Sequence, residues 1–131
     1  NALAIKPDET VLCVSRSMAA EGRQVAYLID ILPTWVLKQS DIPENFDGSV
    51  LDILLKREDL KLHYSRTEIN ADTATPDVAR AMGIQRGDVL LKLVAYLYTL
   101  NRTMVDYSFS YFLPGYFRFH VIRSLETPAN R

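Results

Sequence analysis

The sequence predicts an α+β domain, built as a mainly antiparallel sheet with helices on one face. Two long stretches, residues 10–33 and 88–117, are rich in β-branched and aromatic residues, and a turn signal interrupts each of them, as expected of hairpins. Short segments with helix-capping residues lie between the two. A length of 131 residues and a hydrophobic content of 48% fit one domain with its own core.

The first half of the chain predicts a hairpin followed by helices. The hairpin turns at Glu21-Gly22, between two apolar runs. Residues 33–48 predict a short helix and a loop, because proline and glycine interrupt this segment. A second helix is expected over residues 48–59, where Ser49 or Asp47 can cap an apolar stripe at helical spacing that consists of Val50, Ile53 and Leu54.

The second half predicts a strand, a helix and a second hairpin. Residues 60–74 favour a strand. Thr75 is suited to cap the next helix, Pro76 to occupy its first turn and Gly83 to end it. The second hairpin turns at Asn101-Arg102. Residues 117–124 predict a last strand, followed by a polar tail.

A weak internal repeat relates the two hairpins. Ala2 and Ala81 share an offset of 79 residues (81 − 2), and Ile5 and Ile84 share the same offset. We therefore expect two pseudo-repeats, of which the first has lost most of its leading helix at the start of the chain. Packed structural units often leave a cleft between them, which is where small-molecule pockets usually form.

Composition narrows the possible functions. A net charge of -1 and a pI near 6.1 argue against a nucleic-acid surface on this chain. The single cysteine, Cys13, and the two histidines, His63 and His120, form no zinc-type spacing, so we expect no metal site and no cofactor. No apolar run is long enough for a membrane span and no signal peptide is visible, which favours a cytoplasmic protein.

The order of motifs along the chain carries a family resemblance. An arginine-bearing strand leads into "GRQVA", a helix begins with "SVLDIL", and "ARAMGIQRGDVLL" joins the helix to the second hairpin. The strand "VDYS" and the segment "FRF" follow. This ordered set resembles the UTRA domain, the effector-sensing half of HutC-type GntR transcription regulators, and it covers nearly the whole chain. The resemblance implies a fold similar to that of chorismate lyase.

The resemblance also implies a function. We expect a small-molecule effector, of the organic acid or sugar phosphate class, to bind this domain of a cytoplasmic repressor. The family implies dimerisation through the UTRA sheets and DNA binding through a winged helix-turn-helix domain N-terminal to this one. We expect no enzymatic activity. A chorismate lyase-like enzyme acting on a small organic acid remains the alternative, and a stand-alone binding module is a third class.

Arg16 is the first candidate for ligand binding. It shares a pleat face with Leu12, Val14 and Met18, so it either reaches solvent at a sheet edge or binds an anion in a pocket. The resemblance favours the second reading, because family members use an arginine here to hold the anionic group of the effector. The family often has a second arginine where this chain has Met18, which favours a singly charged or more apolar effector.

Asp106 is the second candidate. It resembles the acid of the family's strand motif, usually glutamate, which accepts hydrogen bonds from the effector. By strand periodicity Asp106 shares a face with Ser108, Ser110 and Phe112, and an exposed cross-strand charge is the alternative. Phe112 stands where the family commonly has tyrosine. Leu28 stands where an acid can occur in sugar-phosphate sensors, so both favour a less polar ligand.

Two further residues have competing interpretations. Ser49 fits an N-cap and also resembles a family contact to the effector through the helix start. Arg66 shares its strand face with Glu68, and a pair between the two is the simpler interpretation, with Arg66 kept as a secondary ligand candidate. The predicted ligand-binding set is therefore Arg16, Met18, Leu28, Ser49, Arg66, Asp106, Ser108 and Phe112.

Overall fold

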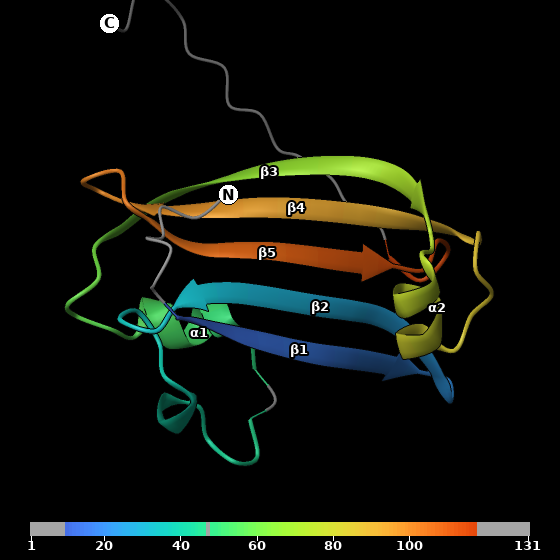
Figure 1. The fold of residues 1–131 in the computed structure, drawn as a ribbon, viewed down its shortest axis with the longest axis horizontal. Coiled ribbons are helices and arrows are strands. Elements are labelled where there is room, and N and C mark those ends of the chain that lie inside the picture. Colours follow the sequence, from blue (N-terminus) through green and yellow to red (C-terminus); the bar gives the residue numbers. More distant parts are fainter. Residues whose placement is uncertain (1–9, 47, 118–131) are drawn as a thin grey trace, which may run out of the picture.

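The computed structural model describes residues 10–46 and 48–117 and shows one antiparallel sheet with helices at its two ends (Figure 1). Five strands lie in the order β1-β2-β5-β4-β3. The strands are β1 (Val11–Ala20), β2 (Arg23–Pro33), β3 (Leu62–Thr73), β4 (Val89–Thr99) and β5 (Met104–Phe112). The predicted α+β class with a mainly antiparallel sheet is confirmed. The strand predicted over residues 117–124 lies outside the described residues, apart from Phe117.

Two hairpins, β1-β2 and β4-β5, form most of the sheet, as the internal repeat predicts. The first turns at Glu21 and Gly22, both at positive φ, which is the backbone of a tight two-residue hairpin turn. The second turns through Arg102, also at positive φ. The hairpins meet where β2 pairs with β5, between Ala26–Phe112 and Ile31–Tyr107. We call this β2-β5 boundary the seam.

The helix α1 (Val50–Leu55) begins at the predicted cap, Ser49. Its buried residues, Val50 and Leu54, pack with Leu32 of β2 and Val105 of β5 in one of two core clusters. The short helix expected within residues 33–48 is a turn followed by the 3-10 helix η1 (Gln39–Asp41). Between Pro33 and Pro43 the chain buries Val36 and Leu37 in the core and does not form a regular α-helix.

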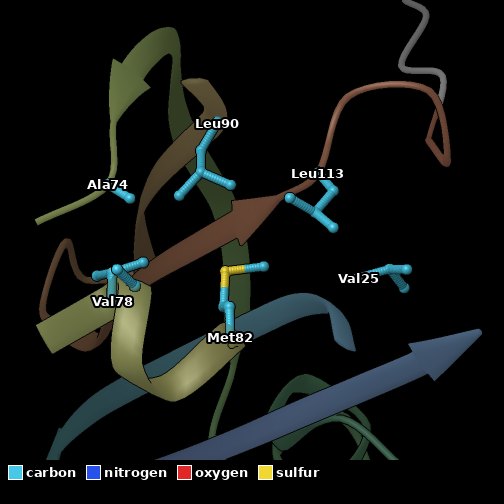
Figure 2. Packing of buried hydrophobic residues seen from close by; sticks show 7 residues of the cluster. Val25, Ala74, Val78, Met82, Leu90 and Leu113 are labelled. Atoms are coloured by element: carbon cyan, nitrogen blue, oxygen red, sulfur yellow. The ribbon is translucent and has the colours of Figure 1, made fainter. Parts of the chain in front are cut away.

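The helix α2 (Pro76–Met82) also begins and ends as predicted. Thr75 caps its N-terminus, and Gly83 ends it in the left-handed conformation, at φ 66. Figure 2 shows Val78 and Met82 of α2 packed with residues from the strand ends. This second core cluster consists of Val25, Ala74, Val78, Ala79, Met82, Leu90 and Leu113.

The strand register defines two faces of the sheet. The face that we call the acidic face carries Arg16, Met18, Leu28, Asp30, Asp106, Ser108, Ser110 and Phe112. The opposite face, which we call the tyrosine face, carries Tyr27, Tyr64, Tyr96, Tyr98, Tyr107, Phe109 and Tyr111. The helices do not share a face: α1 packs with Leu12 and Leu97, on the acidic face, whereas α2 packs with Tyr27 and Tyr111.

Candidate functional site

A small pocket opens on the acidic face beside the seam. It has a volume of about 120 Å³, and Leu51 of α1 closes part of it. Carboxyl, hydroxyl and aliphatic groups from α1 and from the strands β2, β3, β4 and β5 line it. The lining residues are Asp30, Leu51, Ser65, Ala95, Leu97, Asp106 and Ser108. A concave site with a few converging polar groups on an apolar wall is the usual form of a small-molecule site.

Asp106 is the most deeply buried acid of this pocket, with 6% of its surface exposed. A bulge lies next to it in β5: Leu97 pairs with Asp106 and the next residue, Tyr98, pairs with Met104, so Val105 is an extra residue. Burial, followed by the neighbouring Asp30 carboxyl group, raises the pKa of Asp106 to about 10. Asp106 is therefore protonated at neutral pH. Its Oδ1 has no hydrogen-bond partner in the described chain.

Arg16 lies on the same face, on the edge strand β1. Its Cα pairs with that of Leu28. The guanidinium reaches toward the loop before α1, where Nη1 donates a hydrogen bond to the carbonyl oxygen of Gly48 and the group lies 5.6 Å from the centre of the Phe46 ring. Its Nε is buried and has no partner within the described residues. Arg16 thus has one donor directed into the protein and unused.

Ser49 acts as the predicted cap. Its hydroxyl accepts a hydrogen bond from the N–H of Asp52 at 3.0 Å, and its own N–H donates to the Asp52 carboxylate at 3.2 Å. Both bonds lower the pKa of the Asp52 carboxyl group, and the bond from the backbone N–H of Ser49 has the larger effect. Both polar groups of Ser49 that face the helix start are therefore used in capping.

The predicted apolar and hydroxyl residues divide into buried and exposed members. Phe112 is 8% exposed and contacts Phe117 edge-to-face, with ring centres 4.7 Å apart. Leu28 is half-buried, whereas Met18, at the edge of the sheet, is 44% exposed. Ser108 lines the pocket directly. Of the predicted set, Asp106 and Ser108 line this pocket together.

Arg66 lies apart from the other predicted residues, on the tyrosine face. It pairs with Glu68 at 3.2 Å, as the simpler interpretation expects, and stands over the ring of Tyr96 at 5.8 Å. Its side chain is 68% exposed. The reason is strand parity: Arg66 pairs with Tyr96, while the pocket residue Ser65 pairs with Leu97.

Sequence reasoning missed Asp30. It lies two residues after Leu28 in an otherwise apolar strand, and its Cα pairs with that of Ser108 across the seam. The signal was present, because an acid in the run "VAYLIDILP" with the parity of a predicted site residue belongs on the same face. Ser65 was also missed, since the order in which strands pair does not follow from one strand's pattern.

Two further searches concern the described residues only. No group of three or more His, Cys, Asp or Glu side chains within residues 10–46 and 48–117 could hold a metal ion. None of the helices in these residues has the length and hydropathy needed to cross a membrane.

The described chain is an α+β domain with one antiparallel sheet and a small pocket on its acidic face. A family model described as the UTRA domain matches residues 1–118. The chain belongs to the UTRA domain family. A search of curated protein sequences finds no match.

Solved structures share this fold. The effector binding domain of the trehalose repressor TreR from B. subtilis is 22% identical, with a TM-score of 0.80, and the match covers 96% of this chain and 87% of that one. A GntR-family transcriptional regulator from Enterococcus faecalis V583 is 21% identical, with a TM-score of 0.75 and coverages of 93% and 87%. A GntR-family regulator from Bacillus cereus is 17% identical, with a TM-score of 0.79 and coverages of 94% and 85%.

Proposed function

We propose that this chain is the effector-sensing domain of a bacterial GntR-family transcription regulator. The observation that carries the proposal is a small pocket on the sheet of a UTRA domain, lined by the buried Asp106, whose Oδ1 has no hydrogen-bond partner within the described residues. An unsatisfied buried polar atom costs free energy, and a ligand that satisfies it recovers that cost. The arrangement suits reversible binding of a small polar molecule.

The effector is an organic acid or a sugar phosphate whose anionic group binds at Arg16. The unused Nε of Arg16 supports this assignment, since guanidinium donors suit carboxylate and phosphate oxygens. Asp106 and Ser108 orient the polar end of the ligand. Met18, Leu28 and Phe112 form the apolar wall of the acidic face. Ser49 holds the start of α1 and with it the loop that contacts Arg16.

The regulator acts as a cytoplasmic, homodimeric repressor of the HutC type, with a winged helix-turn-helix domain upstream. The tyrosine face supports dimerisation, because α2 covers it at one end only and half-buried aromatic rings form the rest. Tyrosine is enriched at protein interfaces. Effector binding changes DNA affinity only if the ligand prefers one arrangement of the two subunits.

Substitution of Arg16 tests the anion-binding role. We expect Arg16→Ala to weaken binding of the best acid or phosphate from a thermal-shift panel by at least tenfold, because a charge-assisted contact is lost. Arg66→Ala removes an exposed arginine from the opposite face and serves as the matched control. Equal affinities of the two variants would exclude Arg16 from the site.

A chorismate lyase-like activity is the second candidate. The observation that favours it is the protonated Asp106 carboxyl group, since a neutral acid in a pocket can serve as a general acid. Binding compounds from the same panel separate the two candidates when they are followed by NMR. An effector is recovered unchanged, whereas an enzyme's substrate is consumed.

A further inference from the structure

We propose that Asp30 and Asp106 form a binding site for the primary ammonium group of the effector, so that the effector is a zwitterion whose anionic group lies at Arg16. This inference rests on the proposed sensing function and adds a residue, Asp30, and a ligand class to it. Anionic recognition alone leaves the two carboxyl groups without a role.

The first step is the juxtaposition of the two acids. Asp30 on β2 and Asp106 on β5 flank the seam on the same face, and both line the 120 Å³ pocket. Asp106 is 94% buried, since 6% of its surface is exposed, and its Oδ1 is unpartnered within the described chain. A buried acceptor without a donor thus belongs to a side chain that lines a pocket of the size of a small polar group.

The second step is the charge balance around the pair. The neighbouring elements offer Arg16 from β1, the half-buried Asp30 from β2, and Asp52 from α1, while β3 and β4 contribute Ser65, Ala95 and Leu97. Arg16 is bound to the Gly48 carbonyl and the Phe46 ring, and no ion pair joins it to either acid in the described residues. Within residues 10–46 and 48–117, neither acid therefore forms an ion pair with a protein cation.

The third step is the chemistry that such a pair selects. Asp106 shares a small pocket with a second carboxyl group, and burial together with this neighbour favours retention of its proton. An ammonium group supplies positive charge and three donors, which can bond to oxygens of both side chains. Binding then releases the proton of Asp106 to solvent, and the charge of the ammonium group balances the carboxylate that is left.

The fourth step sets the size of the ligand. Arg16 lies two residues along β1 from Val14, the residue that pairs with Asp30. Strand geometry gives a Cα separation of roughly 8 Å between Arg16 and Asp30. The side chains of both residues are thus near enough on one face for a single small molecule that carries an amine and an acid to contact both.

Methylammonium tests the acid pair without knowledge of the effector. We titrate it into the 131-residue chain labelled with 13C at aspartate carboxyl groups, at pH 7, and use acetamide as the neutral control. The Asp106 carboxyl signal is expected to move to the position of an ionised group with methylammonium and to stay unchanged with acetamide. Equal responses, or none at 100-fold excess over protein, overturn the proposal.

Isosteric variants locate the response. Asp30→Asn and Asp106→Asn are each expected to weaken the methylammonium response at least tenfold. Asp77→Asn, at a side chain that is 91% exposed on α2, is expected to leave the response unchanged. An unchanged response in Asp30→Asn excludes Asp30 from the site. If a variant does not fold, the comparison of methylammonium with acetamide in the wild-type chain still tests whether the site binds an ammonium group.

A matched set of probes separates this inference from the sensing function. 4-Aminobutanoate is compared with butanoate and with its N-acetyl form in a thermal-shift titration. We expect the free amine to bind at least tenfold more tightly. DNA affinity is measured on the full-length regulator that contains this domain. If a compound without an amine binds through Arg16 and alters that DNA affinity, the sensing function stands and the zwitterion proposal falls. If methylammonium ionises Asp106 but no compound alters the DNA affinity of the regulator, the acid pair stands and the sensing function falls.

Discussion

At the scale of single residues, the burial and protonation of Asp106 determine which ligand groups the pocket can bind. Asp106 is 6% exposed, its carboxyl group forms no ion pair within residues 10–46 and 48–117, and its burial favours the neutral form. Such a group costs stability when the pocket is empty, as functional groups often do. The cost has a definite pH dependence.

Replacement of Asp106 by a neutral residue should stabilise the chain relative to the wild type, and this difference should grow as pH rises. The pKa of Asp106 is higher in the folded chain (about 10) than its ordinary value of 3.8, so the folded state binds the proton more tightly between these values. Wild-type stability therefore falls with increasing pH across this window, by up to about 1.4 kcal/mol per pH unit. Urea unfolding gives the free energy of unfolding of Asp106→Asn minus that of the wild type. We expect this difference to increase by up to about 4 kcal/mol from pH 5 to pH 8. Parallel stability curves would contradict this assignment.

Single-residue prediction from the sequence succeeded where strand parity sufficed. Parity placed Asp106 and Ser108 on one face of β5, because side chains alternate along a strand, and the register through β2 puts Arg16 on the same face. It could not show that Arg66 belongs to the other face, since that depends on the register between β3 and β4. The bulge at Val105, next to Asp106, also has no clear mark in the sequence.

At the scale of elements, local capping chemistry fixes the two helices. Ser49, Thr75 and Gly83 occupy the positions that their side chains or backbone freedom favour. These were predictable because a cap depends on three or four adjacent residues. The segment around η1 was not, because its shape follows from burying Val36 and Leu37 against the sheet rather than from helix propensity.

Loss of the α1 cap should loosen the loop that contacts Arg16. Ser49→Ala removes the acceptor for the Asp52 N–H, and we expect a loss of about 1 kcal/mol in the free energy of unfolding. Ser40→Ala, at an exposed hydroxyl in η1, is the control. Urea denaturation measures both. A loss for Ser49→Ala no larger than that of the control would show that the capping box contributes nothing to stability.

At the scale of the whole molecule, the sheet order had to come from the structure. The repeat predicted two hairpins, but joining β2 to β5 and adding β3 beyond β4 requires contacts distant in sequence. The positions of the helices on different faces follow from this order, because each connection crosses a different end of the sheet. Figure 1 shows the result, in which much of the tyrosine face carries no helix.

The tyrosine face gives a test of the dimer. Stacked rings such as Tyr96 and Tyr107, 5.2 Å apart, occupy its centre. We expect Tyr96→Asp to shift the chain from dimer to monomer in light scattering after size exclusion, because it removes a stacked aromatic ring and its contact with Arg66 from the face. Ile69→Asp changes a residue that is 49% exposed on the opposite face, and should leave the dimer intact. A dimeric Tyr96→Asp variant would place the interface elsewhere.

The seam gives the sheet a mechanical property. Each hairpin is held internally by a long ladder, whereas the two are joined to each other only along β2 and β5. A ligand bound by one acid from each side of that junction would connect the two hairpins. It would resist their twisting relative to each other. Because one hairpin contains the β1 edge and the other lies beside the β3 edge, fixing the angle at the centre sets the direction in which both outer edges point.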